Sequence, residues 1–71
     1  MSLVVHLARY RKAAGMTQAE LATAAGVSRK TINTVENSVF IPSTTLALTL
    51  AHVLGISVHD LFELKTERTK P

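Results

Sequence analysis

The sequence predicts an all-α domain whose centre is a pair of short helices that meet at a tight turn. Within residues 18–37, apolar residues recur at the spacing of one helix face on both sides of Gly26. Glycine can adopt the positive φ that such a turn requires, and Ala22 is small enough to let the two helices approach closely. The other inward positions of the pair are Leu21, Ala25, Val27, Ile32 and Val35. An ordinary helical hairpin, which uses the same small residues, is the alternative interpretation.

Capping residues and helical periodicity predict three further helices around this pair. Thr17 and Glu20 have the spacing of a capping box, in which each side chain satisfies a free backbone N–H at a helix start. Ser28 and Ser57 are the expected caps of the third and fifth helices. The predicted helices cover residues 6–14, 18–25, 29–36, 43–54 and 58–64, in a domain over residues 1–66 that is followed by a disordered tail at 67–71.

Length and composition narrow the class of protein. A chain of 71 residues forms one small domain, which is marginally stable unless its core is well packed or copies associate. The sequence contains no cysteine, so disulfides and thiolate metal sites are excluded. No apolar run approaches the roughly 20 residues of a membrane span, and the N-terminus does not have the pattern of an export signal. We expect a cytoplasmic protein with no membrane segment.

Positive charge gathers in the first half of the chain. The formal net charge is +3. Residues 1–37 contain five basic and two acidic side chains, whereas residues 38–64 contain two acidic side chains and no basic one. A basic N-terminal half suits contact with phosphates, although a solvated helix face would have the same composition. The residues concerned are Arg9, Arg11, Lys12, Arg29 and Lys30 against Glu20 and Glu36, followed by Asp60 and Glu63.

These features together resemble the small Cro/cI-type helix-turn-helix regulators of the Xre family. The resemblance covers about residues 7–62 and rests on Arg11 with GMTQAELA, then GVSRKTI, Glu36-Asn37, Pro42-Ser43 and LALTLAHVLGISVHDLF, in family order and spacing. It implies a compact five-helix, lambda-repressor-like domain, and it allows a short β pairing between the two termini. It also implies that the third helix enters the major groove of double-stranded DNA.

The expected DNA contacts divide into those that read bases and those that hold the backbone. Arg29 and Lys30 stand at the exposed start of the third helix and favour guanine O6 and N7, while plain surface solvation is their alternative role. One turn later, Asn33 and Thr34 are candidates for adenine or a thymine methyl group. The expected backbone contacts are Gln18, Ser28, Asn37, Ser43, Thr44 and Thr45.

The resemblance also implies a structural ion pair between Arg11 and Glu36, which would tie the first helix to the third. The chain departs from the family pattern in the loop after Asn37. Family members often have glycine and a basic residue there, but residues 38–41 read Ser-Val-Phe-Ile. The usual basic phosphate contact is therefore missing, and Val39 and Ile41 are candidates for packing on the domain or on a partner.

Apolar residues at both ends of the chain predict a homodimer. More apolar surface gathers there than a monomer of this size can readily cover. In resembling repressors a two-fold interface near the last helix sets the recognition helices about 34 Å apart, which is one turn of DNA. For Phe62 the alternative is that it closes the monomer core. The expected interface residues are Leu3, Val4, Val5, Val58, Leu61, Phe62 and Leu64.

No residue pattern supports catalysis, a cofactor or a metal. His52, His59 and Asp60 are expected to lie on the surface, because the two histidines belong to different helices and no fourth ligand is evident. The leading hypothesis is a transcriptional repressor that binds an inverted-repeat operator as a homodimer. The alternative is an antitoxin-like or accessory module that mainly binds another protein, and an enzyme is the third possibility.

Overall fold

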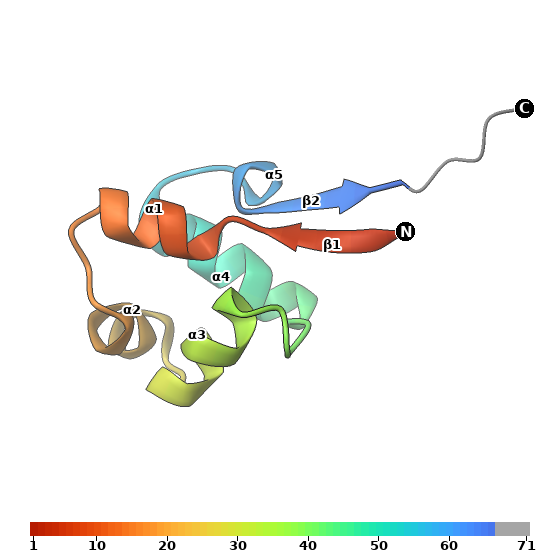
Figure 1. The fold of residues 1–71 in the computed structure, drawn as a ribbon. Helices are drawn as coiled ribbons and strands as arrows, with labels where there is room; N and C mark the ends of the chain where they lie inside the picture. The colour runs from red at the N-terminus through yellow and green to blue at the C-terminus, as the bar shows by residue number, and fades with distance from the viewer. Residues whose placement is uncertain (67–71) are drawn as a thin grey trace, which may run out of the picture.

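The computed structural model describes residues 1–66, which contain five helices and a two-stranded sheet (Figure 1). The prediction of a compact five-helix domain is therefore confirmed, and the short β pairing between the terminal segments that the resemblance allowed is present. No helix in residues 1–66 is long and apolar enough to cross a membrane. The elements are β1 (Ser2–Val5), α1 (Leu7–Ala13), α2 (Gln18–Ala25), α3 (Arg29–Glu36), α4 (Thr44–Leu54), α5 (Val58–Leu61) and β2 (Phe62–Lys65).

Polar side chains and glycine set the helix boundaries, as predicted. Thr17 and Glu20 form the capping box at the start of α2. Gly26 ends α2 with φ 74°, the left-handed conformation that permits the tight turn into α3. The hydroxyls of Ser28 and Ser43 accept hydrogen bonds from backbone N–H groups of α3 and α4.

The core is made by apolar side chains from all five helices. Leu7, Leu21, Ile32, Val35, Leu50 and Leu61 are completely buried, and Ala22 and Ala51 fill the close approaches between helices. No polar or charged residue within residues 1–66 is classed as buried. The contact between α2 and α3 is the most extensive among the helices, so the predicted helix-turn-helix is the structural centre of the domain.

The end of the chain corrects the prediction of a fifth helix reaching Leu64. Helix α5 ends at Leu61, and Phe62 has the extended conformation φ −132°, ψ 137°. Residues 62–65 instead form β2, antiparallel to β1, with Val5 opposite Phe62 and Leu3 opposite Leu64. The β-branched Val4 and Val5 favour a strand in β1. The backbone N–H and C=O groups of residues 62–65 form hydrogen bonds with β1, in place of those that they would form within a longer α5.

Leu61 is the second correction. Its side chain is completely buried inside the protomer, so its assignment to a dimer interface is wrong. Phe62 is partly buried and packs against the core, as its alternative role required, whereas the side chain of Leu64 is 65% exposed. The expected tail at 67–71 lies outside the described residues.

Candidate nucleic-acid interface

The start of α3 presents two cations to solvent. Arg29 and Lys30 occupy its first two positions, both are exposed, and the first turn contains no acidic residue. Among the ion pairs of residues 1–66, neither side chain takes part. Positive charge at a helix N-terminus is unfavourable because the helix dipole is positive there, so this arrangement does not serve the stability of α3.

One turn further along, Asn33 and Thr34 differ in how far their polar groups are already used. The exposed Asn33 side chain donates to Gln18 Oε1 at 3.5 Å and accepts from Asn37 Nδ2 at 3.3 Å. Thr34 is partly buried, and its hydroxyl donates to the carbonyl oxygen of Thr31 at 3.0 Å. Thr34 therefore has its hydrogen-bond donor occupied within the helix, which leaves its methyl group and the acceptor lone pairs of its hydroxyl for an outside partner.

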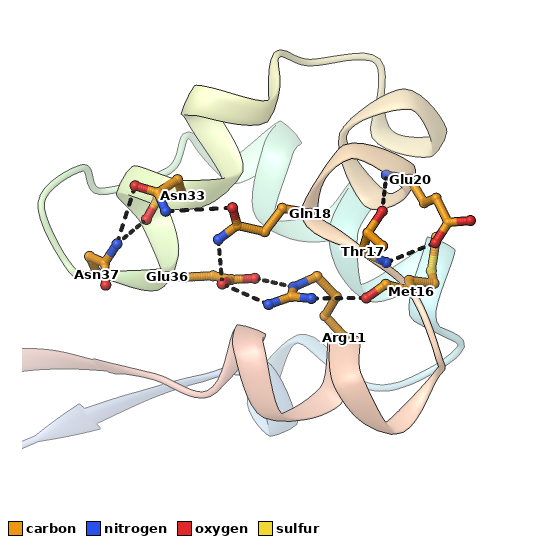
Figure 2. A network of polar contacts seen from close by, with 8 residues as sticks. All are labelled: Arg11, Met16, Thr17, Gln18, Glu20, Asn33, Glu36 and Asn37. Carbon is orange, nitrogen blue, oxygen red and sulfur yellow. Dashed lines mark hydrogen bonds and ion pairs between the residues drawn. The ribbon is translucent and has the colours of Figure 1, made fainter.

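The expected ion pair between Arg11 and Glu36 is present and continues into the candidate interface (Figure 2). Arg11 Nε donates to Glu36 Oε2 at 2.6 Å and Arg11 Nη2 donates to Glu36 Oε1 at 3.2 Å, in a two-pronged contact. The same Oε1 accepts from Gln18 Nε2 at 2.9 Å. A chain of side-chain hydrogen bonds thus runs from Arg11 on α1 through Glu36 and Gln18 to Asn33 and Asn37.

Burial and hydrogen bonding oppose each other at Glu36. Burial tends to raise the pKa of this carboxyl, but hydrogen bonds from Arg11 and Gln18, with the charges of Arg11 and Lys12, outweigh it and hold the pKa below its ordinary value. The hydrogen bond to Glu36 raises the pKa of Arg11, against the opposing effect of desolvation. Both side chains are therefore charged, and only 11% of Arg11 and 6% of Glu36 is exposed.

The expected backbone contacts lie at four helix ends, namely the starts of α2, α3 and α4 and the end of α3. Gln18 begins α2, and its Nε2 is held by Glu36, which leaves Oε1 facing Asn33. Asn37 follows α3, and its side-chain Nδ2 donates to the carbonyl oxygen of Asn33 at 2.9 Å. Ser28 bonds both the backbone and the hydroxyl of Thr31. Ser43, Thr44 and Thr45 are exposed at the start of α4, where Ser43 caps the helix.

Two features of this region escaped the sequence analysis. The bond from Gln18 to Glu36 joins side chains 18 residues apart, and no local pattern predicts it. The loop of residues 38–41 folds back onto α3, because Ser38 adopts φ 60° and the backbone N–H groups of Val39 and Phe40 both donate to the carbonyl oxygen of Thr34. The unusual apolar composition of the loop was visible in the sequence, but its position beside α3 was not.

Metal ligands do not gather anywhere in the part of the chain that the structure describes. No group of three or more histidine, cysteine, aspartate or glutamate side chains is placed to hold a metal ion there. His52 is exposed on α4, and His59 is exposed on α5, where its backbone N–H donates to the Ser57 hydroxyl. Asp60 completes a capping box with Ser57, which gives this carboxylate a structural role.

Curated relatives and a family model describe the same domain. A helix-turn-helix family model matches residues 7–61. An uncharacterised HTH-type transcriptional regulator of Methanocaldococcus jannaschii is 40% identical over 53 residues, which are 75% of this chain and 80% of that protein. A second one, from Methanothermobacter thermautotrophicus, is 40% identical over 62 residues, covering 86% of this chain and 90% of the relative.

Solved structures share the fold. The restriction-modification controller protein C.AhdI from Aeromonas hydrophila matches with a TM-score of 0.73 and 31% identity over 76% of this chain and 82% of its own. A chain of the SinR–SinI protein complex matches with a TM-score of 0.71 and 33% identity over 76% of this chain and 53% of its own. The family match spans well over half of the sequence and agrees with the helix order and the core. This chain therefore belongs to the Cro/cI-type, Xre-like helix-turn-helix family, and it is a transcriptional regulator with a DNA-binding domain.

Proposed function

We propose that this regulator is a repressor that binds an inverted-repeat operator as a homodimer, with α3 of each protomer in the major groove. The observation that carries the proposal is the cationic start of α3. Arg29 and Lys30 are exposed there against the helix dipole and without acidic neighbours in the first turn. Each such cation destabilises an isolated helix by about 0.3–1 kcal/mol. Contact with guanine acceptors or with phosphates removes this unfavourable interaction and contributes to the affinity for DNA.

Reading and positioning fall to different residues in this proposal. Arg29 and Lys30 read guanine, and Asn33 and Thr34 contact bases one turn later. Gln18, Ser28, Asn37 and the start of α4 hold the phosphates and so set the depth and angle of α3. The hydrogen bonds from Glu36 through Gln18 to Asn33 support this division, because they orient a backbone contact and a base contact together.

A homodimer is supported by the distribution of exposed apolar side chains. Met1, Phe40, Ile41, Leu48 and Leu64 are all exposed, and they line three hollows that share Leu3. Soluble monomers rarely leave such a continuous apolar surface to water. The proposed interface keeps Leu3, Val4, Val5, Val58, Phe62 and Leu64 from the sequence analysis and omits the buried Leu61.

The order of residues in β2 supports pairing with a second copy. In residues 1–66 the sheet has two strands, so β2 keeps one edge without a strand partner. If two copies of β2 pair antiparallel about an axis through Leu64, Glu63 of each strand lies opposite Lys65 of the other. Opposite charges at directly facing positions contribute roughly 0.2–1 kcal/mol, whereas like charges repel. The strand is thus complementary to itself in this register.

Repression requires only that the domain occupies its operator, and no contact with the transcription machinery is needed. A dimer seated on an operator that overlaps a promoter excludes the transcription machinery by occupying the site. Two protomers read two half-sites and so gain the specificity that one small module lacks against genomic competition. A DNA target supports the cytoplasmic location that the sequence analysis expects.

Selection of sites from random duplex DNA tests the proposal. We expect an inverted repeat whose half-site centres lie one helical turn apart, bound by two chains. A promoter carrying the selected site should be less active in the presence of the protein. Failure to enrich any sequence would overturn the proposed function, and enrichment of a single half-site bound by one chain would overturn the homodimer.

A protein partner is the second candidate, in line with the antitoxin-like alternative. The matched SinR–SinI structure is a complex of two proteins, and the hollows around Leu3 are lined by exposed apolar side chains that a different chain would cover as well as a second copy. Sedimentation of the purified protein at micromolar concentration separates the two candidates. A dimer supports self-association, whereas a monomer that forms a stoichiometric complex with a co-encoded protein supports the second candidate.

A further inference from the structure

Val39 lies where it can take part in reading DNA. Its side chain is 76% exposed, yet the loop that carries it is fastened to the recognition helix. The backbone N–H of Val39 donates to the carbonyl oxygen of Thr34 at 2.9 Å, and that of Phe40 donates to the same oxygen at 3.2 Å. The loop therefore moves with α3 and presents Val39 at a defined position.

Val39 and the base-reading face of α3 share one hollow. Lys30, Thr31, Thr34, Val39 and Phe40 line this open hollow of about 320 Å³. Lys30 and Thr34 are among the residues proposed to contact bases, so the hollow is continuous with the proposed DNA interface. Because Val39 lines the same hollow, its side chain lies close to the part of the DNA that Lys30 and Thr34 would contact.

The chemistry of the hollow favours one group on DNA. The hydroxyl of Thr34 donates to Thr31, so Thr34 offers its methyl group rather than a hydrogen-bond donor. Val39 adds two more methyl groups, and Phe40 supplies part of the wall. In the major groove the C5-methyl group of thymine is the feature that apolar side chains contact.

We infer that Val39 and the methyl group of Thr34 form a pocket for the methyl group of a thymine next to the base pair read by Lys30. This inference rests on the proposed function, since it deepens the specificity of the same interface. It assigns a reading role to a loop in which resembling proteins place a basic phosphate contact, and it accounts for an exposed valine beside a DNA-binding helix.

Replacement of thymine by deoxyuracil tests the inference, because it removes the methyl group and leaves every hydrogen-bonding atom in place. Each thymine of a selected operator half-site is replaced in turn, and the affinity of the full chain is measured by titration. We expect one position at which uracil weakens binding about fourfold, which corresponds to the roughly 0.8 kcal/mol of one buried methyl-sized group. Equal affinity for all uracil-substituted sites would overturn the inference while leaving sequence-specific binding intact.

Ile41 provides a matched control for Val39. Both are exposed apolar residues of the same loop, at 76% and 74%, but Ile41 lines the hollows near Leu3 instead of the one beside Lys30. In Val39→Ser the preference for thymine over uracil should fall well below fourfold, because only the Thr34 methyl group remains, and in Ile41→Ser the fourfold difference should remain. Persistence of the full fourfold difference in Val39→Ser would overturn the inference. If the unmodified chain enriches no sequence at all, both the proposed function and this inference are wrong.

Discussion

Gln18 and Glu36 are joined by a hydrogen bond of 2.9 Å that ties the first residue of α2 to the last residue of α3. The acceptor, Glu36 Oε1, also accepts from Arg11, so one partly buried carboxylate holds α1, α2 and α3 together (Figure 2). Because Gln18 in turn accepts from Asn33, the ion pair supports both the fold and the candidate interface.

Removal of Glu36 should strongly destabilise the domain. In Glu36→Ala, the guanidinium of Arg11, whose side chain is only 11% exposed, loses its counter-charge and Gln18 loses its acceptor, so we expect about 3 kcal/mol less stability. Urea denaturation of the single variants and of the double variant with Arg11→Met measures this. The double change should cost less than the two single changes added together, and strict additivity would show that the two residues act independently.

The depressed pKa of Glu36 predicts a loss of stability in acid. A carboxyl whose pKa is lower in the folded state stabilises the protein fully above its ordinary pKa of about 4.3, and this contribution disappears as the pH falls through the folded-state value. Thermal denaturation from about pH 6 to about pH 3 should show the decline. Glu36→Gln, which cannot titrate, should be less stable near neutral pH but show a shallower decline, and an identical slope would contradict the assignment.

Arg29 and Lys30 should affect specificity more than Gln18 does. Arg29→Ala or Lys30→Ala should weaken binding to the selected operator by roughly 1–3 kcal/mol and binding to random DNA much less. Gln18→Ala should weaken both more evenly, because phosphate contacts carry little sequence information. Titrations at one fixed salt concentration test this, and equal losses on both DNAs for Arg29→Ala would exclude it as a base contact.

Leu64→Glu should give a folded monomer. The side chain is 65% exposed within the protomer, so the core survives, but two glutamates would face each other across the proposed axis. We expect sedimentation as a monomer and at least about tenfold weaker binding to the full operator, since the paired half-sites are no longer bound together. A dimer with unchanged affinity would place the interface elsewhere.

Charge exchange on β2 tests the register of the proposed pairing. Glu63→Lys should weaken the dimer by placing like charges opposite each other, and adding Lys65→Glu should restore it. Both variants lose the 3.0 Å contact between Glu63 and His6, so this loss cancels in the comparison. Without recovery in the double variant, this strand register is wrong.

Ser38 should be a site where glycine stabilises the fold. Its φ of 60° is left-handed, which costs a residue with a side chain roughly 1–2 kcal/mol, partly offset by the greater unfolded-state entropy of glycine. We expect Ser38→Gly to raise the free energy of unfolding by about 0.5 kcal/mol, as measured by urea denaturation. Ser38→Ala, which stays strained, is the control and should bring no gain.

The helical part of the fold is predictable from the sequence alone, because the signals that encode it are local. Thr17 with Glu20, Gly26 at the turn, and the spacing of Leu21, Ile32 and Val35 act within a few residues. The exposed cations at the start of α3 were identifiable for the same reason, as was the pairing of Arg11 with Glu36 once the family pattern had placed them.

Features that depend on contacts between segments far apart in the chain are visible only in the folded structure. Residues 62–65 became a strand because β1 lies beside them, a pairing across about sixty residues that no local period encodes. The same packing buried Leu61 and left Leu64 exposed. The backbone conformation of Ser38 brought Val39 beside Thr34, and the meeting of α1, α2 and α3 joined Gln18 to Glu36. Local sequence preferences determine where helices form. Contacts that form only on folding determine where each helix ends and which side chains stay exposed to solvent.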